Sequence, residues 1–307
     1  MYRKIVFMGT SYFAVPILKS LYQNGYPISV VYTQPPKKSN RGQKLNKSPI
    51  NLFSENISLE IRTPHTLKKN IEEEIYLTKL QPDLIIVVSY GQIIPKNLLS
   101  IPKYGFLNVH ASLLPKWRGA APIQRSIMNL DKETGISIMK INENLDEGPV
   151  CDQYSIKIYQ NMNSDELSEK LSLLASEKIL DILDNIYDDQ IKFKEQDHSK
   201  ATYAKKIQKI EGKINWNENA DNIIGKINGL YPFPGAFFFF NGERYKILKA
   251  EKSYTMGEPG NVISEDLEIC CGKESIKVLT IQREGKRVQQ INEFLLGNQI
   301  KKGSNIA

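Results

Sequence analysis

Cysteine, histidine and tryptophan are scarce in this chain, whose 307 residues include three cysteines, three histidines and two tryptophans. The cysteines, Cys151, Cys270 and Cys271, lack metal-ligand spacing, and an odd number of cysteines does not suit a disulfide framework. The sequence therefore predicts neither a bound metal nor a disulfide-linked domain, and a reducing cytoplasm is the expected location.

Long apolar runs are absent as well. No stretch reaches the roughly 18 uncharged apolar residues that a membrane-spanning helix needs. Near the N-terminus, Gly9, Thr10 and Ser11 interrupt the apolar run before the core of a signal peptide forms. We therefore expect no secretion and no association with a membrane.

The glycine pattern of a dinucleotide-binding turn is incomplete. The first apolar run leads into "MGTSYFAVP", where Gly9 stands alone although the G-x-G-x-x-G pattern requires three glycines. Without the second and third glycines, the backbone cannot approach a pyrophosphate closely. The turn therefore argues against a nicotinamide cofactor.

Positive charge is present in excess, with a net charge of +7. It is concentrated in two runs: residues 34–49 hold five basic side chains and no acidic one, and residues 200–213 hold five basic side chains with Glu211 as the only acid. One such run is usually solvated surface, whereas two of them favour a polyanionic partner.

The first part of the chain alternates apolar runs with helical patterns. The runs predicted as strands are residues 4–10, 28–34, 83–91, 105–112, 134–141 and 149–158, most of them nearly unbroken in hydrophobicity. The predicted helices are residues 12–25, 70–80 and 163–187, the last with Ser164 as its N-cap. This alternation predicts an α/β fold with a doubly wound, mostly parallel sheet covered by helices.

Beyond a polar, aperiodic stretch, the pattern changes to short apolar segments separated by turn residues. These segments are residues 236–240, 244–250, 260–264, 267–272 and 276–282. Several short strands within about 100 residues are typical of a small antiparallel barrel. The sequence therefore predicts a second, all-β domain.

Asn108 and His110 lie at the end of a predicted strand, where side chains two residues apart project from the same face. Ligands of open α/β sheets bind beyond the carboxyl ends of the strands. Asp146 follows another predicted strand and precedes Gly148, so it can reach the same place, although an isolated loop aspartate is usually a turn residue.

An amide, an imidazole and a carboxylate without a serine or cysteine nucleophile suit direct transfer of a carbonyl group to an external amine. The amide would hold the developing oxyanion, and the imidazole would donate a proton to it or to the leaving nitrogen. The carboxylate would support the imidazole. This chemistry needs no metal and no covalent intermediate.

At these residues the sequence resembles the folate-dependent formyltransferases. The segment that carries the resemblance around His110 is "NVHASLLPKWRGAAPIQ". The resemblance continues through "GTSYFAVPILKSL", "RGQKLNKSPI", "VVSYGQIIP", "LDEGP", "ATYAKKIQKIEGKINW" and "YPFPGA", so it covers nearly the whole chain.

This resemblance implies that the donor is 10-formyltetrahydrofolate and that the acceptor is the α-amino group of initiator methionyl-tRNA. Asn108, His110 and Asp146 fall on the catalytic positions of the family. The implied folate contacts are Ser112, Leu113, Leu114 and Pro115, with Tyr90 and Gly91 beside the pterin. Arg41 falls in the loop that meets the acceptor stem, and we expect Lys206 and Lys209 to bind tRNA phosphates.

The implied domains are a formyltransferase catalytic domain over residues 1–189, a linker over 190–205 and an OB-like tRNA-binding domain over 206–307, in a monomer. Asn144 and Glu147 depart from the glycine and threonine usual in the family beside Asp146. Arg118 can bind a carboxylate or a phosphate. Two alternatives stay open: a formyltransferase acting on an amino sugar nucleotide, and an RNA-binding protein without catalysis.

Overall fold

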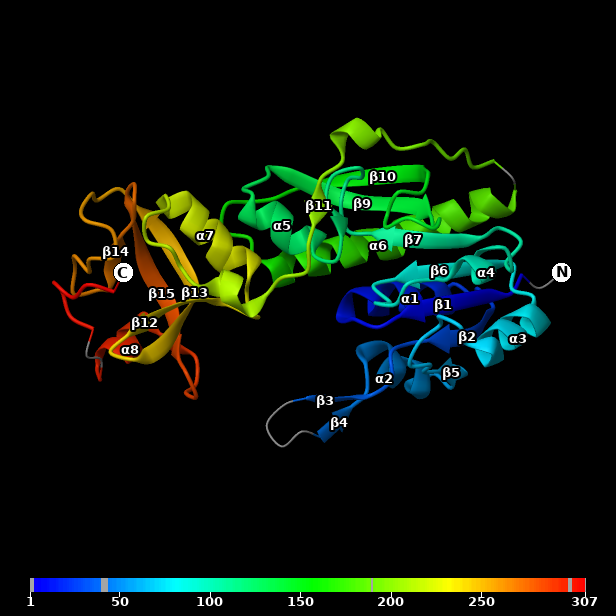
Figure 1. Ribbon diagram of the computed structural model, residues 1–307, viewed down its shortest axis with the longest axis horizontal. Helices are drawn as coiled ribbons and strands as arrows, with labels where there is room; N and C mark the ends of the chain where they lie inside the picture. The colour runs from blue at the N-terminus through cyan, green and yellow to red at the C-terminus, as the bar shows by residue number, and fades with distance from the viewer. Residues whose placement is uncertain (1–2, 40–43, 189, 298–299, 307) are drawn as a thin grey trace. The chain divides into compact units, whose positions relative to one another are not determined.

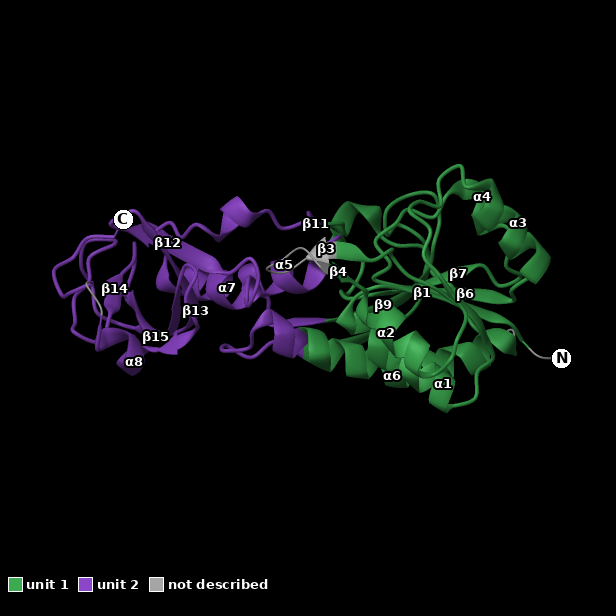
Figure 2. Cartoon of the chain, turned by 90° about the horizontal axis from the view of Figure 1, so that it is seen from below, with its two compact units in different colours: residues 1–119, 135–156, 168–203 green, residues 120–134, 157–167, 204–307 purple. Residues whose placement is uncertain are grey.

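The computed structural model describes residues 3–39, 44–188, 190–297 and 300–306. The chain divides into two compact units, coloured separately in Figure 2. Unit 1 comprises Met1–Gly119, Gly135–Ile156 and Ser168–Tyr203, and unit 2 comprises Ala120–Thr134, Lys157–Leu167 and Ala204–Ala307. The domain boundaries expected at residues 189 and 205 stay a prediction.

Unit 1 is built on a seven-stranded sheet with the strand order β10-β9-β7-β6-β1-β2-β5 (Figure 1). Its strands are β1 (Ile5–Gly9), β2 (Ile28–Tyr32), β5 (Ile61–Arg62), β6 (Leu84–Val88), β7 (Phe106–His110), β9 (Glu133–Lys140) and β10 (Val150–Lys157). β5, β2, β1, β6 and β7 pair in parallel, and β9 pairs antiparallel to β7. The predicted doubly wound, mostly parallel sheet is confirmed.

Helices cover both faces of this sheet (Figure 2). On one face, α1 (Val15–Gln23) lies beside α6 (Ser164–Tyr187), where the Ser20 hydroxyl donates to the carbonyl of Ser176 at 2.7 Å. On the other face lie α3 (Ile71–Leu80) and α4 (Lys96–Leu99), whose Leu77 and Leu98 join a buried cluster with Val6 and Ile85 of the sheet. Alternate residues of β1 and β6 thus face opposite helical layers.

The remaining elements of unit 1 are short. They are η1 (Tyr12–Ala14), α2 (Pro49–Asn56), β3 (Lys37–Ser39), β4 (Lys44–Asn46), β8 (Arg118–Gly119) and η2 (His198–Lys200). β3 and β4 form an antiparallel pair on either side of residues 40–43. Arg41, the predicted acceptor-stem residue, therefore lies outside the described residues.

The N-terminus of α6 corrects one prediction. Asn163, not Ser164, acts as the cap, because its Oδ1 accepts from the amides of Asp165 and Glu166, both at 3.0 Å. The Glu166 carboxylate in turn accepts from the amide of Asn163 at 3.2 Å, which completes a reciprocal capping box. The Ser164 hydroxyl instead donates to the carbonyl of Tyr231.

Unit 2 is built on a five-stranded antiparallel sheet, β12-β13-β15-β14 with β16 paired to β15. Its strands are β12 (Ala236–Phe240), β13 (Glu243–Ser253), β14 (Glu268–Cys270), β15 (Ser275–Arg283) and β16 (Gln289–Gln290), and its helices are α5 (Pro122–Met128), η3 (Lys209–Gly212), α7 (Ala220–Gly229) and α8 (Ile291–Leu295). β11 (Tyr203–Ala204) pairs with β8. The strand predicted at 260–264 is wrong, because Asn261 and Val262 form isolated bridges only.

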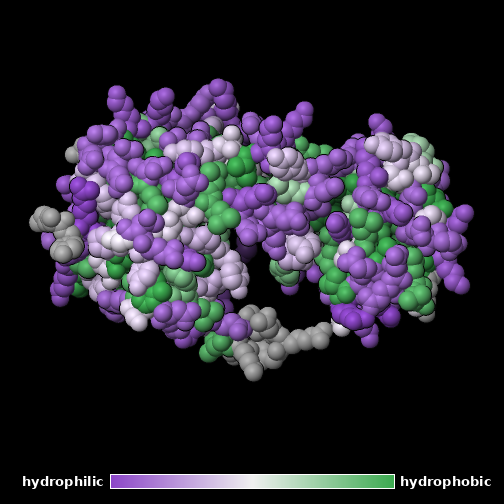
Figure 3. All heavy atoms as spheres, turned by 180° about the vertical axis from the view of Figure 1, so that it is seen from behind, coloured by the Kyte–Doolittle hydropathy of each residue, from purple (hydrophilic) through white to green (hydrophobic). Residues whose placement is uncertain are grey.

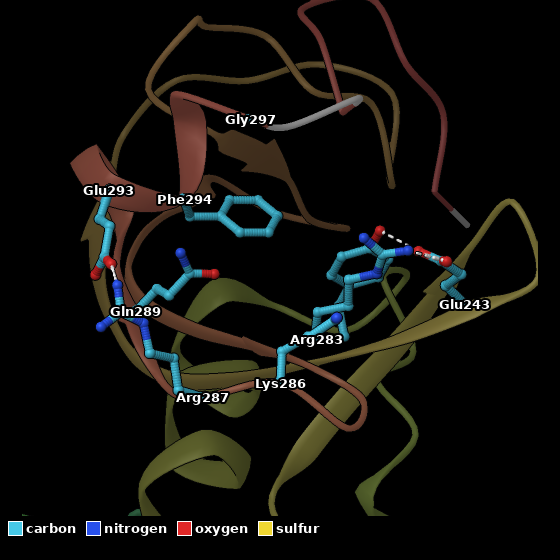
Figure 4. A pocket seen from close by; sticks show the side chains of 9 residues that line it. Glu243, Arg283, Lys286, Arg287, Gln289, Glu293, Phe294 and Gly297 are labelled. Atoms are coloured by element: carbon cyan, nitrogen blue, oxygen red, sulfur yellow. Dashed lines mark hydrogen bonds and ion pairs between the residues drawn. The ribbon is translucent and has the colours of Figure 1, made fainter.

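A cavity of about 320 Å³ opens between β13, β15, β16 and α8 of unit 2 (Figure 4). Tyr245 and Phe294 form its aromatic wall, with ring centroids 5.9 Å apart and nearly perpendicular planes. Its arginines Arg283 and Arg287 are paired with the carboxylates of Glu243 and Glu293. Much of the positive charge around this cavity is therefore neutralised within the unit itself.

Hydrophilic residues cover most of the face seen in Figure 3, with apolar residues scattered between them. Among the helices of the described residues, none combines the length and the apolar character needed to cross a membrane.

Candidate active site

Strand β7 presents two of the three predicted catalytic side chains. Asn108 and His110 are two residues apart, so both project from one face of the sheet at the carboxyl end of β7. The antiparallel neighbour β9 pairs Met139 with Asn108 and Ser137 with His110. After β9 the chain turns through residues 141–149, and this loop carries Asp146 back toward the end of β7.

Asp146 lies between the other two side chains. Its Oδ1 accepts a long hydrogen bond from Nδ2 of Asn108 at 3.3 Å, and its Oδ2 lies 3.7 Å from Nδ1 of His110. The His110 and Asp146 side chains are only 7% and 14% exposed, so their electrostatic interaction is weakly screened by solvent. The structure therefore brings the three predicted catalytic residues together.

The orientation of His110 is fixed by the backbone. Its Nε2 lies 2.9 Å from the carbonyl oxygen of Trp117, and because a carbonyl can only accept, Nε2 carries a proton and donates it. Nδ1 is then the ring nitrogen that faces Asp146. Any proton that His110 exchanges with a bound molecule is accordingly exchanged at Nδ1, on the same side as Asn108 and Asp146.

The loop that holds Asp146 has an unusual conformation. Asp146 has a φ of +51°, a region that aspartate and asparagine adopt more readily than most residues. Its Oδ2 accepts from the amide of Gly119 at 2.8 Å. A Cβ on Gly148 would lie 1.9 Å from the carbonyl oxygen of Lys140, so only glycine allows the loop to approach β9 this closely.

The two departures from the family pattern beside Asp146 have structural explanations. Glu147 pairs with Nη1 of Arg118 at 3.0 Å, so the buried guanidinium binds a carboxylate of its own chain. Asn144 is not among the described residues with positive φ, and its amide donates to Oδ1 of Asn142. The turn therefore does not need the backbone freedom of glycine at position 144.

Ser137 of β9 anchors the predicted folate loop through hydrogen bonds to the loop backbone. The Ser137 hydroxyl donates to the carbonyl of Ser112 at 2.6 Å and accepts from the amide of Leu114 at 3.0 Å. Nε2 of Gln153 donates to the same hydroxyl and to the carbonyl of Leu114. Ser112 and Leu114 are buried, whereas Leu113 and Pro115 are partly exposed and can contact a ligand with their side chains.

Tyr90 and Gly91 follow β6 at the same edge of the sheet. The Tyr90 ring is 1% exposed and packs in the core with Tyr32 and Leu98, so the ring itself is not available to a ligand. The Tyr90 carbonyl accepts from the hydroxyl of Thr10 at 2.8 Å. Gly91 has a φ of +79° and is exposed.

Lys206 and Lys209 are exposed residues of unit 2. Their segment is held by Arg125, which donates to the carbonyl of Lys205 and forms an ion pair of 2.6 Å with Glu211. Both ammonium groups are thus displayed on a fixed backbone. Their role in binding tRNA stays a prediction, as does that of Arg41.

Two residues that support the predicted folate loop, Ser137 and Gln153, were not predicted from the sequence. Each is an isolated polar residue, and no motif marks it. Within the part of the chain that the structure describes, no group of three or more His, Cys, Asp or Glu side chains is placed to hold a metal ion.

Comparison with known proteins agrees with the predicted family. The family model described as formyl transferase matches residues 3–183, and the model described as formyl transferase, C-terminal domain, matches residues 206–299. The methionyl-tRNA formyltransferase of Pelagibacter ubique (strain HTCC1062) is 65% identical over 307 residues, which cover 100% of this chain and 99% of that protein.

Solved structures with a similar fold include the N-formyltransferase from Helicobacter canadensis in complex with folinic acid and dTDP-3-aminofucose. Its TM-score is 0.69 at 19% identity, covering 91% of this chain and 99% of that chain. HypX from Aquifex aeolicus in complex with tetrahydrofolic acid has a TM-score of 0.68 at 16% identity, and this chain, 98% of which is covered, spans 49% of its length. At these identities the likeness shows the fold alone.

Proposed function

This chain belongs to the formyl transferase family, and on that basis we propose that it transfers a formyl group from 10-formyltetrahydrofolate to the α-amino group of initiator methionyl-tRNA. The observation that carries this proposal is the meeting of Asn108, His110 and Asp146 at the end of β7. The full-length similarity to a methionyl-tRNA formyltransferase supports the choice of acceptor.

The chemistry of the site fits a formyl donor. When an amine attacks the formyl carbon, negative charge develops on the formyl oxygen, and a preorganised hydrogen-bond donor stabilises it. Asn108 has two N–H donors on Nδ2, and the bond of one of them to Asp146 is long at 3.3 Å. The amide can therefore turn toward the oxyanion at little cost.

Departure of the folate nitrogen requires a proton, and Nδ1 of His110 is the group in place to take the proton that the attacking amine releases and to pass it to that nitrogen. Because Nε2 is bound to the carbonyl of Trp117, the ring cannot rotate without losing that bond. Oδ2 of Asp146, 3.7 Å from Nδ1, stabilises the imidazolium that forms before the proton is passed on. The acceptor amine needs no strong base, since α-amino groups titrate near pH 8 and are partly neutral in the cell.

The folate contacts that we propose are the loop from Ser112 to Pro115, including Leu113 and Leu114, and the backbone of Tyr90 and Gly91. The loop is fixed to β9 through Ser137 and borders His110 directly along the chain. The chain has no need of a metal for this reaction, because the amide and imidazole carry the charge that develops.

For the tRNA, we propose the domain over residues 206–307 with the preceding linker, and Arg41 in the acceptor-stem loop. Lys206 and Lys209 are exposed cations that can neutralise phosphates. We further propose that the protein works in the cytoplasm as a monomer.

An acceptor comparison tests the proposal. Initiator methionyl-tRNA, elongator methionyl-tRNA and an amino sugar nucleotide would each be incubated with the protein and 10-formyltetrahydrofolate, and formylated product would be measured. We expect efficient formylation of the initiator tRNA only. Formylation of the sugar nucleotide alone would favour that alternative, and tRNA binding without any formylation would indicate an RNA-binding protein without catalysis.

A further inference from the structure

Gln196 lies in the predicted linker over residues 190–205, yet it is only 8% exposed. Its Nε2 donates to the backbone carbonyls of Asp146 at 2.9 Å and Gly148 at 2.7 Å. Its Oε1 accepts from Nε and Nη2 of Arg118 at 3.1 and 2.8 Å. One buried amide therefore joins the loop of a proposed catalytic residue to the loop that follows His110.

Arg118 fixes the orientation of this amide. The guanidinium is 1% exposed and can only donate, so the side-chain oxygen of Gln196 must face it and the NH2 group must face the two carbonyls. The charge of Arg118 is balanced by the Glu147 carboxylate, 3.0 Å from Nη1, and Nη2 of Arg118 lies 3.3 Å from Nδ1 of His198. The Gln196 amide therefore cannot flip, because interchanging its oxygen and its NH2 group would leave buried polar groups unpaired.

The same segment also holds the loop behind His110. Thr202 accepts from the amide of Trp117 through Oγ1 and from the amide of Arg118 through its carbonyl, both at 2.9 Å. The Thr202 amide donates to the carbonyl of Pro115 at 3.2 Å. Trp117 is the residue whose carbonyl accepts from Nε2 of His110. Residues 196–202 therefore hydrogen-bond both to the backbone that holds His110 and to the loop that carries Asp146.

We propose that Gln196 is a positioning residue, which sets the distance between Asp146 and His110 by holding the backbone of Asp146 in its left-handed conformation. The inference rests on the proposed function, because the distance matters only if these groups act together. Asp146 has a φ of +51°, and the Gln196 bonds to its carbonyl and to that of Gly148 restrain the peptide groups that follow it. Without them the loop can relax, and Asp146 moves away from Nδ1 of His110.

Two substitutions separate positioning from simple support of the fold. Gln196→Glu keeps an acceptor for Arg118 but, when ionised, has no donor for the two carbonyls. Gln196→Met keeps the approximate size and loses both functions. The matched control is Gln190→Met, at an exposed glutamine of the chain.

We expect Gln196→Glu to lower kcat by roughly 10- to 100-fold, because a displacement of about 1 Å in a catalytic group costs on that order. KM for both substrates should change by less than about threefold, since the groups that bind the substrates are untouched. Gln190→Met should match the wild type. If Gln196→Glu and Gln196→Met both keep the wild-type kcat, the inference is wrong.

Hydrogen exchange gives a readout that does not depend on turnover. The amide of Gly119 donates to Oδ2 of Asp146 at 2.8 Å, so its exchange rate reports where that carboxylate lies. Gln196→Glu should accelerate exchange at Gly119 while leaving distant strands such as β1 protected. If exchange at Gly119 is unchanged in Gln196→Glu, the inference is wrong, whatever the activity of the protein. If the wild type formylates no tRNA, only the proposed function is contradicted.

Discussion

Replacement of Asp146 by asparagine is the substitution that isolates the charge of the carboxylate. Asp146 accepts from Gly119 through Oδ2 at 2.8 Å and from Asn108 through Oδ1 at 3.3 Å, and Oδ2 lies 3.7 Å from His110. An asparagine has a single acceptor oxygen, so it can keep the bond from Gly119 but must turn its NH2 group toward Asn108. The negative charge beside His110 is then lost.

The magnitude follows from the interaction removed. Oδ2 and Nδ1 are too far apart for a hydrogen bond, so the interaction removed is the attraction between two charges, which is worth about 4 kcal/mol near this separation at an effective dielectric constant of about 20. If this attraction is made fully in the transition state, its loss lowers kcat by up to about 1,000-fold. Folding should be little affected, because asparagine accepts the φ of +51° at this position as aspartate does.

The assay is steady-state formylation of initiator methionyl-tRNA at saturating donor, with thermal unfolding measured on the same preparations. Asp146→Ala serves as the comparison, because it loses both hydrogen bonds and adds left-handed backbone strain of about 1 kcal/mol. Its Tm should fall, while that of Asp146→Asn should stay near the wild type. A kcat for Asp146→Asn within about twofold of the wild type would refute the catalytic role and leave Asp146 as a turn residue.

The remaining predictions concern the other catalytic residues, the thiols and the basic runs. Asn108→Ala and His110→Ala should each lower kcat by about 100- to 1,000-fold with folate affinity largely kept, as single-turnover rates and equilibrium titration would measure; near-normal turnover removes the residue from the mechanism. Burial raises the pKa of the Cys151 and Cys271 thiols to about 12, so both should react slowly with a thiol reagent at pH 8. Cys271, which is 2% exposed, should stay unlabelled until the protein is unfolded, and rapid labelling of Cys271 in the native protein would contradict the packing around it. Lys206→Ala and Lys209→Ala should each reduce the slope of log K for tRNA against log salt by roughly 0.7 without changing which tRNA is preferred, whereas Arg41→Ala should weaken the preference for the initiator; wild-type behaviour of all three variants would show that the two runs are solvated surface only.

The sequence predicted the parts of the fold that depend on local pattern. The apolar runs at β1 and β6 are buried at every residue, and those at β2 and β7 at most residues, which is why they could be recognised as strands of a parallel sheet. The antiparallel direction of β9 was not predicted, because a fully buried strand shows the same pattern in either direction. That the side chains of Asn108 and His110 project from the same face of the strand follows from strand geometry alone.

What the sequence could not predict depends on contacts between distant segments. Gln196 and Thr202 lie in a polar, aperiodic stretch, where nothing local distinguishes a buried amide from a solvated one. Tyr90 was expected beside a ligand, but only the structure shows its ring packed in the core of unit 1. The choice of Asn163 over Ser164 as the cap of α6 likewise depended on a shift of one residue in the helix start.

The most direct test of the account is a crystal structure of the protein with a stable formyl-folate analogue. The account predicts the formyl oxygen within about 3.2 Å of Nδ2 of Asn108 and the adjacent folate nitrogen on the Nδ1 side of His110. A formyl group bound away from these two side chains, with the analogue ordered elsewhere on the protein, would contradict it.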